Sequence, residues 1–479
     1  MGAGVALDAF VVIMKIPSVF RRLFAEGAFN QAFVPILSEY KQNKSEKEVK
    51  DLINHTFASL SVVLLLVTII AFLAAPIFVM VFAPGFYLEP LKKTLAIDIL
   101  QITFPYLFFV SLVALSGSIM NTYERFSLPA LTPLFYNLTL VVVVIWIAPS
   151  QEVPIYAIAW GVFTAGCIQV LIQIKPLIKL GLLPRFHLNL QHPGVKRVMF
   201  LMVPGIIAGG VSQLNMLVDT ILASLLPTGS PSWLYVSDRL MQLPLGIFAI
   251  AIGTVILPKL SSLHSLGSKE DFSKTLDWSI RLILLVGLPA VIGLIMLSEP
   301  IIITLFERGE FMAIDSKNAS LSLVALSLGL LAFMLIKVLT PGFFARQQPK
   351  KPVYVALFSM VLNAFLAWLL GFHLGFNHVG LALASSISAF FTIFSLLYLL
   401  RRERIYNFEK GWFLFLIRLI FASLMLYLTV SFINSEVEVW RNYNEIERFA
   451  RLMFILVSGI TAYFLALWVS GIRAKDLRN

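Results

Sequence analysis

Charged residues lie inside the first long hydrophobic stretch of this chain. The stretch 8–38 reads DAFVVIMKIPSVFRRLFAEGAFNQAFVPILS, and its charges are Asp8, Lys15, Arg21, Arg22 and Glu26. A charge in hydrocarbon costs about 2.5–3.5 kcal/mol on insertion scales, so such residues normally face a cavity or a partner and mark a pathway. The stretch therefore predicts a polar site inside a membrane.

Helical spacing gathers most of these charges on one face. Asp8, Lys15 and Arg22 follow a heptad spacing, and Glu26 lies one turn after Arg22. Arg21 lies about 100° away around an ideal α-helix, so we expect its guanidinium to point in another direction. The alternative is that the polar face only joins helices through internal ion pairs, which accounts less well for Arg21.

A second charged segment lies in the latter half of the chain. The segment 232–258 begins with Ser232 and carries Asp238 and Arg239. Guanidinium groups facing one cavity repel in a low dielectric, and a multivalent anion removes that repulsion. Arginine binds phosphate through a planar, bidentate fork, so Arg21 and Arg239 predict a phosphate-bearing substrate. The alternative is a local pair between Arg239 and Asp238, although helical neighbours do not face each other.

Other polar residues in hydrophobic segments suggest a cation site. Asp219 has Asn215 one turn before it, and Asn363 lies in a later segment. Such oxygen-bearing groups can coordinate a cation or relay a proton. A hydrogen-bonded helix contact is an equally good interpretation.

Composition sets the fold class. Of 479 residues 59% are hydrophobic and 13% are charged, about half the charge of a soluble domain, which predicts an all-α polytopic membrane protein. We expect about thirteen spans, near 8–37, 54–83, 95–120, 129–149, 154–174, 198–226, 232–258, 280–306, 319–343, 353–372, 377–400, 411–433 and 449–471.

A single cysteine, Cys167, excludes an internal disulfide, and six scattered histidines do not predict a metal site. The sequence contains no nucleotide-binding or hydrolase motif, so we expect neither an enzyme nor a cofactor. Without a nucleotide site, movement of a ligand through the membrane would be driven by the membrane potential or by a monovalent cation.

Basic residues are distributed unevenly between the two ends of the spans. Of the 37 Lys and Arg residues, six fall inside spans and 24 in the connections of one side. The other side has seven, which are Lys92, Lys93, Arg308, Lys317, Arg441, Arg448 and Arg451. The basic side is predicted to be cytoplasmic, with the C-terminus on it. The net charge of +11 thus reflects topology, and nucleic-acid binding is not expected.

An internal repeat predicts the domain organisation. PIFVMVFAPGF at 76–86 matches PIIITLFERGEF at 300–311, and further matches at similar offsets include Asn137 with Asn363. An offset near 224 residues predicts two parallel six-helix lobes, at 1–180 and 181–405, followed by two extra helices at 406–479. In this register the first lobe lacks its first helix, so we expect a fourteen-helix architecture of which one helix is missing.

Several runs resemble the lipid II flippase family MurJ (MviN), in the multidrug/oligosaccharidyl-lipid/polysaccharide exporter superfamily. They include LDAFVVIMKIPSVFRRLFAEGAFNQAFVPILSEY at 7–40, WLYVSDRLMQLPLGIFAIAIGTVILPKLS at 233–261 and KVLTPGFFARQ at 337–347. The resemblance implies transport of undecaprenyl-pyrophosphate-linked peptidoglycan precursor between the leaflets of the bacterial inner membrane by alternating access. It also places Asp8, Arg21, Ser232 and Arg239 at cavity positions of the family, and the last two helices at a groove for the lipid tail.

The resemblance leaves alternatives. Another exporter of the superfamily would carry drugs or polysaccharide lipids, but a drug exporter would be expected to use acidic cavity residues. A polymerase using the same lipid would need a large outer loop with catalytic carboxylates, and the predicted outer loops are short. A non-transporting scaffold that binds cell-wall synthesis proteins is a further interpretation.

Overall fold

The computed structural model describes residues 2–22 and 28–473, and within these ranges it consists of helices and connecting loops, without a strand. Side chains at 28, 31, 204, 205, 207–209, 211 and 212 lie outside the description. By contacts the chain forms two compact units, Val5–Leu225, called the N-terminal unit below, and a C-terminal unit that holds the later described residues and Gly2–Gly4.

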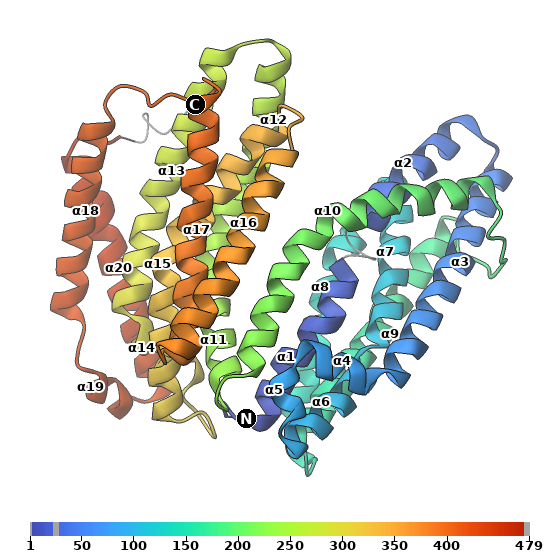
Figure 1. The fold of residues 1–479 in the computed structure, drawn as a ribbon, viewed down its shortest axis with the longest axis horizontal. Helices are drawn as coiled ribbons and strands as arrows, with labels where there is room; N and C mark the ends of the chain where they lie inside the picture. Colours follow the sequence, from blue (N-terminus) through green and yellow to red (C-terminus); the bar gives the residue numbers. More distant parts are fainter. Residues whose placement is uncertain (1, 23–27, 474–479) are drawn as a thin grey trace. The chain divides into compact units, whose positions relative to one another are not determined.

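The helices of each unit are drawn in Figure 1. Those of the N-terminal unit are α1 (Val5–Phe20), α2 (Ala28–Asn43), α3 (Glu46–Leu73), α4 (Ala75–Phe82), α5 (Pro84–Tyr87), α6 (Pro90–Thr103), α7 (Tyr106–Thr122), α8 (Ser127–Val142), α9 (Pro154–Lys179) and α10 (Pro193–Ser224). Those of the C-terminal unit are α11 (Ser230–Pro244), α12 (Ala251–Ser265), α13 (Lys269–Met296), α14 (Ser298–Phe306), α15 (Ala313–Phe344), α16 (Lys350–Ala367), α17 (Asn377–Arg402), α18 (Trp412–Ile433), α19 (Val437–Asn442) and α20 (Glu445–Val469).

In the N-terminal unit, α1 packs against α6 and α10, and α2 packs against α7 and α10. Ile13 and Ile16 of α1 share an apolar cluster with Ile99 of α6. The end of α10 is held by a close backbone contact, because the Gly85 N–H donates to the Ser224 hydroxyl at 3.3 Å. A Cβ at Gly85 would stand 2.0 Å from the Ser224 carbonyl oxygen, so only glycine fits there.

In the C-terminal unit, α15 is the central helix, and α11, α12, α13, α14 and α17 pack against it. Within its most apolar stretch of 18 residues, 67% is buried inside the protein, which is the largest share among the candidate membrane spans. α15 and α17 approach closely, since Gly329 has no side chain and the Ser386 hydroxyl donates to the Ala325 carbonyl at 2.7 Å. Small residues at such a contact are typical of helix packing in membranes.

The last two long helices, α18 and α20, pack against each other and lie beside α13. Gly459 of α20 brings its backbone close to Leu426 and Val430 of α18. The Tyr463 hydroxyl of α20 donates to the Leu285 carbonyl of α13 at 2.8 Å. The pair is therefore attached to the C-terminal unit along α13.

The prediction of an all-α polytopic membrane protein is confirmed. Eleven segments of the described chain are long and apolar enough to cross a membrane, and each corresponds to one of the expected spans. The expected spans 8–37 and 198–226 correspond to α1 with α2 and to α10, which are not among those eleven. The count of thirteen, and the lobe boundaries at 180 and 405, stay predictions.

Three further expected spans are divided into two helices, which corrects their interpretation as single helices: 95–120 is divided between α6 and α7, and the other two are 54–83 and 280–306. The span 54–83 ends at Leu73 and resumes as α4, and the span 280–306 ends at Met296 and resumes as α14. Pro76 and Pro300 lie in the first turns of the two short helices, where a missing N–H costs nothing. The break therefore occurs at corresponding places of the repeat.

Wide π-helical turns also occur at corresponding places. One follows Pro17 at residues 21–22, and another follows Pro244 at Leu245–Ile250. A further pair closes α8, at Val143–Ile147, and α16, at Trp368–His373. Single π turns in a helix are frequent at functional sites and at kinks.

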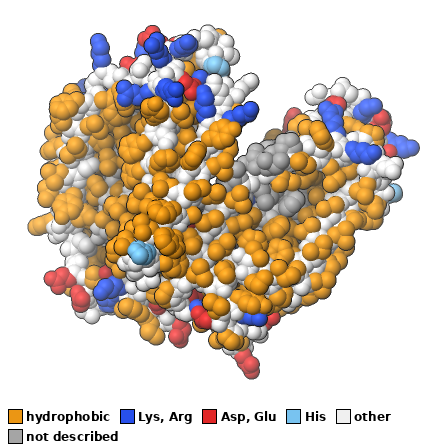
Figure 2. All heavy atoms as spheres, viewed as in Figure 1, with side chains coloured by type: hydrophobic (Ala, Val, Ile, Leu, Met, Phe, Trp, Pro, Cys, Tyr) orange, Lys and Arg blue, Asp and Glu red, His pale blue; other side chains and the backbone are white. Residues whose placement is uncertain are grey.

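Figure 2 shows hydrophobic side chains along the sides of each unit and charged side chains at the helix ends. In the C-terminal unit the connections α12–α13 and α17–α18 share one end, which carries Lys269, Arg401 and Arg402. The opposite end holds α19 with Glu438, and Glu445 and Glu447 at the start of α20. This separation is the charge asymmetry that the sequence predicts.

Candidate functional site

The first charged segment begins with a buried carboxylate. Asp8 lies in the first turn of α1 and is fully buried. Lys15, two turns later, is half-buried. A carboxylate in the first turn of a helix is favoured by the helix dipole. Burial of Asp8 is what the predicted polar face requires, since a charge on the lipid side would be costly.

Arg21 and Arg22 differ in their surroundings. Arg21 is half-buried and Arg22 is exposed. Both lie in the π-helical turn that follows Pro17. The separate direction expected for the Arg21 guanidinium stays a prediction. Glu26 lies outside the described residues, so its predicted role stays a prediction.

The second charged segment is anchored on the central helix of its unit. Ser232, near the start of α11, is fully buried. The Trp233 indole donates to Asp315 Oδ1 of α15 at 2.9 Å, and the Ser237 hydroxyl donates to the Ala319 carbonyl at 2.7 Å. These bonds fix the rotation of α11 about its axis.

Asp238 and Arg239 have contacts in opposite directions along α11. Asp238 is half-buried and accepts a hydrogen bond from the Gln242 amide, one turn later. Arg239 is exposed, and its guanidinium carbon lies 4.9 Å from the centroid of the Tyr235 ring, one turn earlier. A cation over an aromatic face is oriented by the ring quadrupole without losing its charge. Arg239 therefore keeps an accessible guanidinium for an anion.

The expected cation ligands are divided between the two units. In α10, the Asn215 amide donates to Asp219 Oδ2 at 3.4 Å, and both residues are half-buried. Asn363 belongs to α16 of the other unit and is 3% exposed. The pair Asn215–Asp219 is confirmed as neighbours on one helix, and its role with a cation stays a prediction.

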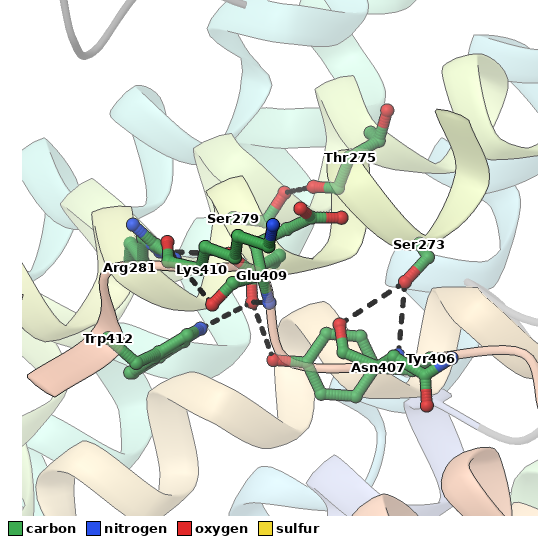
Figure 3. Close-up of polar contacts among 10 residues, drawn as sticks. Ser273, Thr275, Ser279, Arg281, Tyr406, Asn407, Glu409, Lys410 and Trp412 are labelled. Carbon is green, nitrogen blue, oxygen red and sulfur yellow. Dashed lines mark hydrogen bonds and ion pairs between the residues drawn. The ribbon is translucent and has the colours of Figure 1, made fainter. Parts of the chain in front are cut away.

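A polar cluster that the sequence did not predict lies where the chain leaves α17 for α18 (Figure 3). Asp277 of α13 is 2% exposed and accepts hydrogen bonds from the Tyr406 hydroxyl at 2.8 Å and the Trp412 indole at 2.6 Å. The Glu409 N–H donates to the same oxygen at 3.4 Å. The second oxygen of Asp277 lies 2.8 Å from Arg281 Nε.

The neighbouring turns of α13 bind the same connection. Arg281 donates to the Lys410 carbonyl at 3.2 Å, and the Ser273 hydroxyl accepts from the Asn407 N–H at 3.0 Å. Ser273, Asp277 and Arg281 are spaced four residues apart, so they form one face of α13. We call these three residues the α13 clamp. It fixes the connection 403–411 that leads to the α18–α20 pair.

Two further polar contacts lie outside the predicted site. The histidines were expected to be scattered, but the His55 and His192 rings lie 5.0 Å apart, and His55 Nδ1 lies 2.7 Å from the His187 carbonyl. Burial, with the nearby His55 as a second cause, lowers the pKa of His192 below its usual range. Asp98 of α6 accepts a hydrogen bond from the Tyr156 hydroxyl of α9 at 2.6 Å. Among the described residues no group of three or more His, Cys, Asp or Glu could hold a metal ion.

A sequence profile of the family described as "Lipid II flippase MurJ" matches residues 1–450 of this chain. The chain belongs to the MurJ family. A flippase is a transporter, so the family is one of transporters and not of catalytic enzymes. This agrees with a protein of buried and half-buried charges on long apolar helices.

MurJ relatives are similar over the whole chain. A probable lipid II flippase MurJ from Vibrio cholerae serotype O1 is 40% identical over 489 residues, covering 100% of this chain and 92% of the relative. One from Haemophilus influenzae is 38% identical over 493 residues, covering 100% and 96%. The lipid II flippase MurJ of Burkholderia cenocepacia is 35% identical over 484 residues, covering 100% and 93%.

Solved structures agree with membership of the MurJ family. A lipid II flippase MurJ in an inward closed conformation is 27% identical, with a TM-score of 0.81 over 97% of this chain and 92% of that one. An inward-facing MATE transporter of the MOP superfamily is 14% identical, with a TM-score of 0.72 over 84% and 91%. The second likeness shows a shared fold alone.

Proposed function

We propose that this chain moves lipid II, the undecaprenyl-pyrophosphate-linked peptidoglycan precursor, from the inner to the outer leaflet by alternating access. The observation that supports this most is the match to the MurJ family over residues 1–450, together with relatives at 35–40% identity over the whole chain. A charged glycan headgroup cannot cross hydrocarbon unaided, because its polar groups would lose their hydrogen bonds to water. A flippase supplies polar side chains that replace these hydrogen bonds to water.

In this proposal Arg21 and Arg239 contact the diphosphate. Each is accessible to some degree, since Arg21 is half-buried and Arg239 is exposed. Guanidinium forks match phosphate oxygens, and two of them compensate more of a diphosphate's charge than one. Asp8, Arg22, Glu26, Ser232 and Asp238 are proposed to contact the polar headgroup or to orient the two arginines.

The energy source and the location complete the proposal. We propose coupling to the membrane potential or to a monovalent cation, with Asn215, Asp219 and Asn363 as candidate ligands of the cation. The chain would lie in the bacterial inner membrane with its C-terminus in the cytoplasm, because the C-terminal connections are rich in lysine and arginine. Binding of cell-wall synthesis proteins is a further proposal.

Replacement of Arg21 and Arg239 tests the anion contacts. We expect Arg21→Ala or Arg239→Ala to abolish complementation of a strain depleted of its own flippase, while the protein stays at its normal level in the membrane. Arg308→Ala is the control, since Arg308 is an exposed arginine in the connection after α14 and is not among the proposed contacts. Normal growth with both Arg21 and Arg239 replaced would reject these contacts.

A reconstituted assay tests transport itself. Fluorescent lipid II in vesicles that contain the purified chain should become accessible to a quencher on the opposite side, at a rate above that of protein-free vesicles. The arginine variants should reduce that rate. A wild-type rate equal to that of protein-free vesicles would contradict the flippase proposal as a whole.

A further inference from the structure

A cavity of about 240 Å³ lies at one end of the N-terminal unit, at the connection between α2 and α3. Its lining residues are Lys41, Lys44, Glu46, Val49, Lys50, Tyr123, Leu180 and Leu182. They come from three parts of the chain, namely 41–50, the end of α7 and the turn after α9. This is the end predicted to be cytoplasmic, and no residue of the first charged segment lines the cavity.

The cavity has an excess of positive charge. Three lysines face one carboxylate, that of Glu46, in the lining. Lys44 also pairs with Glu48 at 3.4 Å, but Glu48 does not line the cavity. Ammonium groups around a small cavity repel each other, and an anion between them turns this repulsion into attraction.

Two donors of the cavity are held in place. Lys41 Nζ donates to the Thr122 carbonyl at 2.9 Å and lies 4.5 Å from the centroid of the Tyr123 ring. An ammonium has three N–H groups, so donors remain for a ligand. Burial, with Glu46 as a second cause, raises the pKa of Tyr123, so its hydroxyl keeps its proton and can donate as well. These contacts preorganise one wall of the cavity.

Lys50 also lines the cavity and lies beside a glycine turn. Gly181 has a φ of +66°, and a Cβ there would stand 3.9 Å from Lys50 Nζ. Lys50 is exposed, and the described contacts give its ammonium no carboxylate partner. Glycine permits the left-handed turn and leaves space in front of the ammonium.

The cavity is open to solvent on one side, and its volume of about 240 Å³ is large enough for a small anionic group. This accommodates a phosphate with a few ester carbons, and Val49 and Leu182, 3% and 5% exposed, provide an apolar wall for those carbons. Lysine binds phosphate as a point charge, and lysine clusters beside membrane helices bind anionic headgroups.

We propose that this cavity binds a phosphate group, carried by a lipid headgroup or free in solution. Lys41, Lys44 and Lys50 supply the charge, and the Tyr123 hydroxyl supplies a neutral donor. The site is separate from the residues proposed to contact lipid II, so this inference does not depend on the proposed function. A negative result for the phosphate site would not contradict the proposed flippase function, and a negative flippase result would not contradict the phosphate site.

The test compares two lysines of one helix. Lys50 lines the cavity, whereas Lys47 is exposed on the same helix α3 and does not line it. Lys50→Gln and Lys47→Gln remove the same charge, and the thermal unfolding midpoint of the purified full chain in detergent is the measurement. One series adds inorganic phosphate, with sodium chloride at equal ionic strength as reference. A second series adds phosphatidic acid to the micelles, with phosphatidylcholine as reference.

We expect a saturable rise of the midpoint in at least one series for the wild type and Lys47→Gln. For Lys50→Gln the concentration at half effect should rise by about tenfold, the loss of one charge-assisted contact. A response in the phosphate series identifies a free anion as a ligand, and one in the lipid series alone identifies a headgroup. Equal responses of the two variants, or a response no larger than that of the reference additive in both series, would overturn the proposal.

Discussion

Asp277 shows how a single buried carboxylate can hold a connection between helices. It accepts three hydrogen bonds from the segment 406–412 and forms an ion pair with Arg281 on its own helix. The guanidinium of Arg281 also lies 5.0 Å from the Trp412 ring centroid. A buried charge with this many partners is costly to disturb, because removal of one group leaves the others without compensation.

Asp277→Ala should therefore lower the free energy of unfolding by about 3–5 kcal/mol, as expected for breaking a buried ion pair. Thermal unfolding of the purified protein in detergent measures the change. Glu270→Ala is the matched control, since Glu270 lies on the same helix α13, pairs with Lys274 and is 78% exposed. Exposed pairs contribute little, so the control should unfold like the wild type. A wild-type midpoint for Asp277→Ala would contradict a structural role of the clamp.

At the residue scale the sequence predicted the charged groups but not their partners. Asp8, Arg21 and Arg239 could be identified because a charge in an apolar segment is rare in any membrane helix. The α13 clamp could not, because Ser273, Asp277 and Arg281 bind residues 128–135 positions later in the chain. Nothing local distinguishes such carboxylates from solvated ones near a helix end.

At the element scale, His192 caps α10 with a ring nitrogen. Its Nδ1 accepts a hydrogen bond from the Gly194 N–H at 3.2 Å, in place of the usual Ser or Asp oxygen. A protonated imidazole has no free lone pair at Nδ1 and cannot accept this bond. The cap therefore exists only in the neutral form of His192.

This makes the first turn of α10 sensitive to acid. The pKa of His192 is below its usual value of about 6.5 in the folded protein, so the unfolded state binds a proton first as the pH falls. The stabilisation is complete above pH 6.5 and is lost as the pH falls from about 6.5 through the folded pKa. The amides of residues 194–197 should therefore lose protection over this range, measured as hydrogen exchange corrected for its intrinsic pH dependence.

His192→Asn separates the cap from the titration. Asparagine is a good N-cap and does not titrate, so exchange of this turn should then follow the ordinary intrinsic pH dependence alone. An extra acid-induced acceleration that persists in His192→Asn would show that another group causes it. Asp51 and His55, which face His192, would be the next groups to replace.

Hydrophobicity predicted the long helices well, because about twenty apolar residues in a row have few alternatives to a membrane span. It did not predict where those helices break. The run around Ala74 stays apolar through the break, and the run around Leu297 is interrupted only by Ser298 and Glu299, so average hydropathy reads each as one span. Pro76 and Pro300 were local signals, but prolines are tolerated within membrane helices and so do not fix a break.

At the scale of the whole molecule, the charge asymmetry predicts which ends lie in the cytoplasm. Cys167 is the only cysteine, so Cys167→Ser gives a background in which single cysteines can be placed. In this background Glu438→Cys should react with a membrane-impermeant maleimide in intact spheroplasts, because α19 is predicted to lie outside. Arg402→Cys should react only after permeabilisation. Both positions are exposed in the structure, so burial cannot explain a difference.

The opposite labelling pattern would reverse the predicted topology. Equal labelling of both positions in sealed spheroplasts would contradict a single orientation. Expression and thermal stability of the Cys167→Ser background provide the control, since Cys167 is half-buried in α9.

The repeat was readable from the sequence because a few motifs keep a nearly constant offset. The arrangement of the units is a different matter, since it depends on contacts between residues far apart in the chain. Fold class and family could thus be predicted, while the roles of Asp219 and Asn363 could not be decided from their residue types. Amides and carboxylates in apolar helices serve equally well in helix packing and in ion binding.

The paired π turns carry information about the history of the chain. A π turn accommodates one more residue than an α turn, because its hydrogen bonds join residues five apart instead of four. Such turns close α8 and α16 and also follow Pro17 and Pro244, at matching places of the two halves. Separate origins of the wide turns in the two halves would require more events than inheritance of both turns from one duplicated half. If the predicted repeat arose by duplication, we infer that both wide turns were present before it.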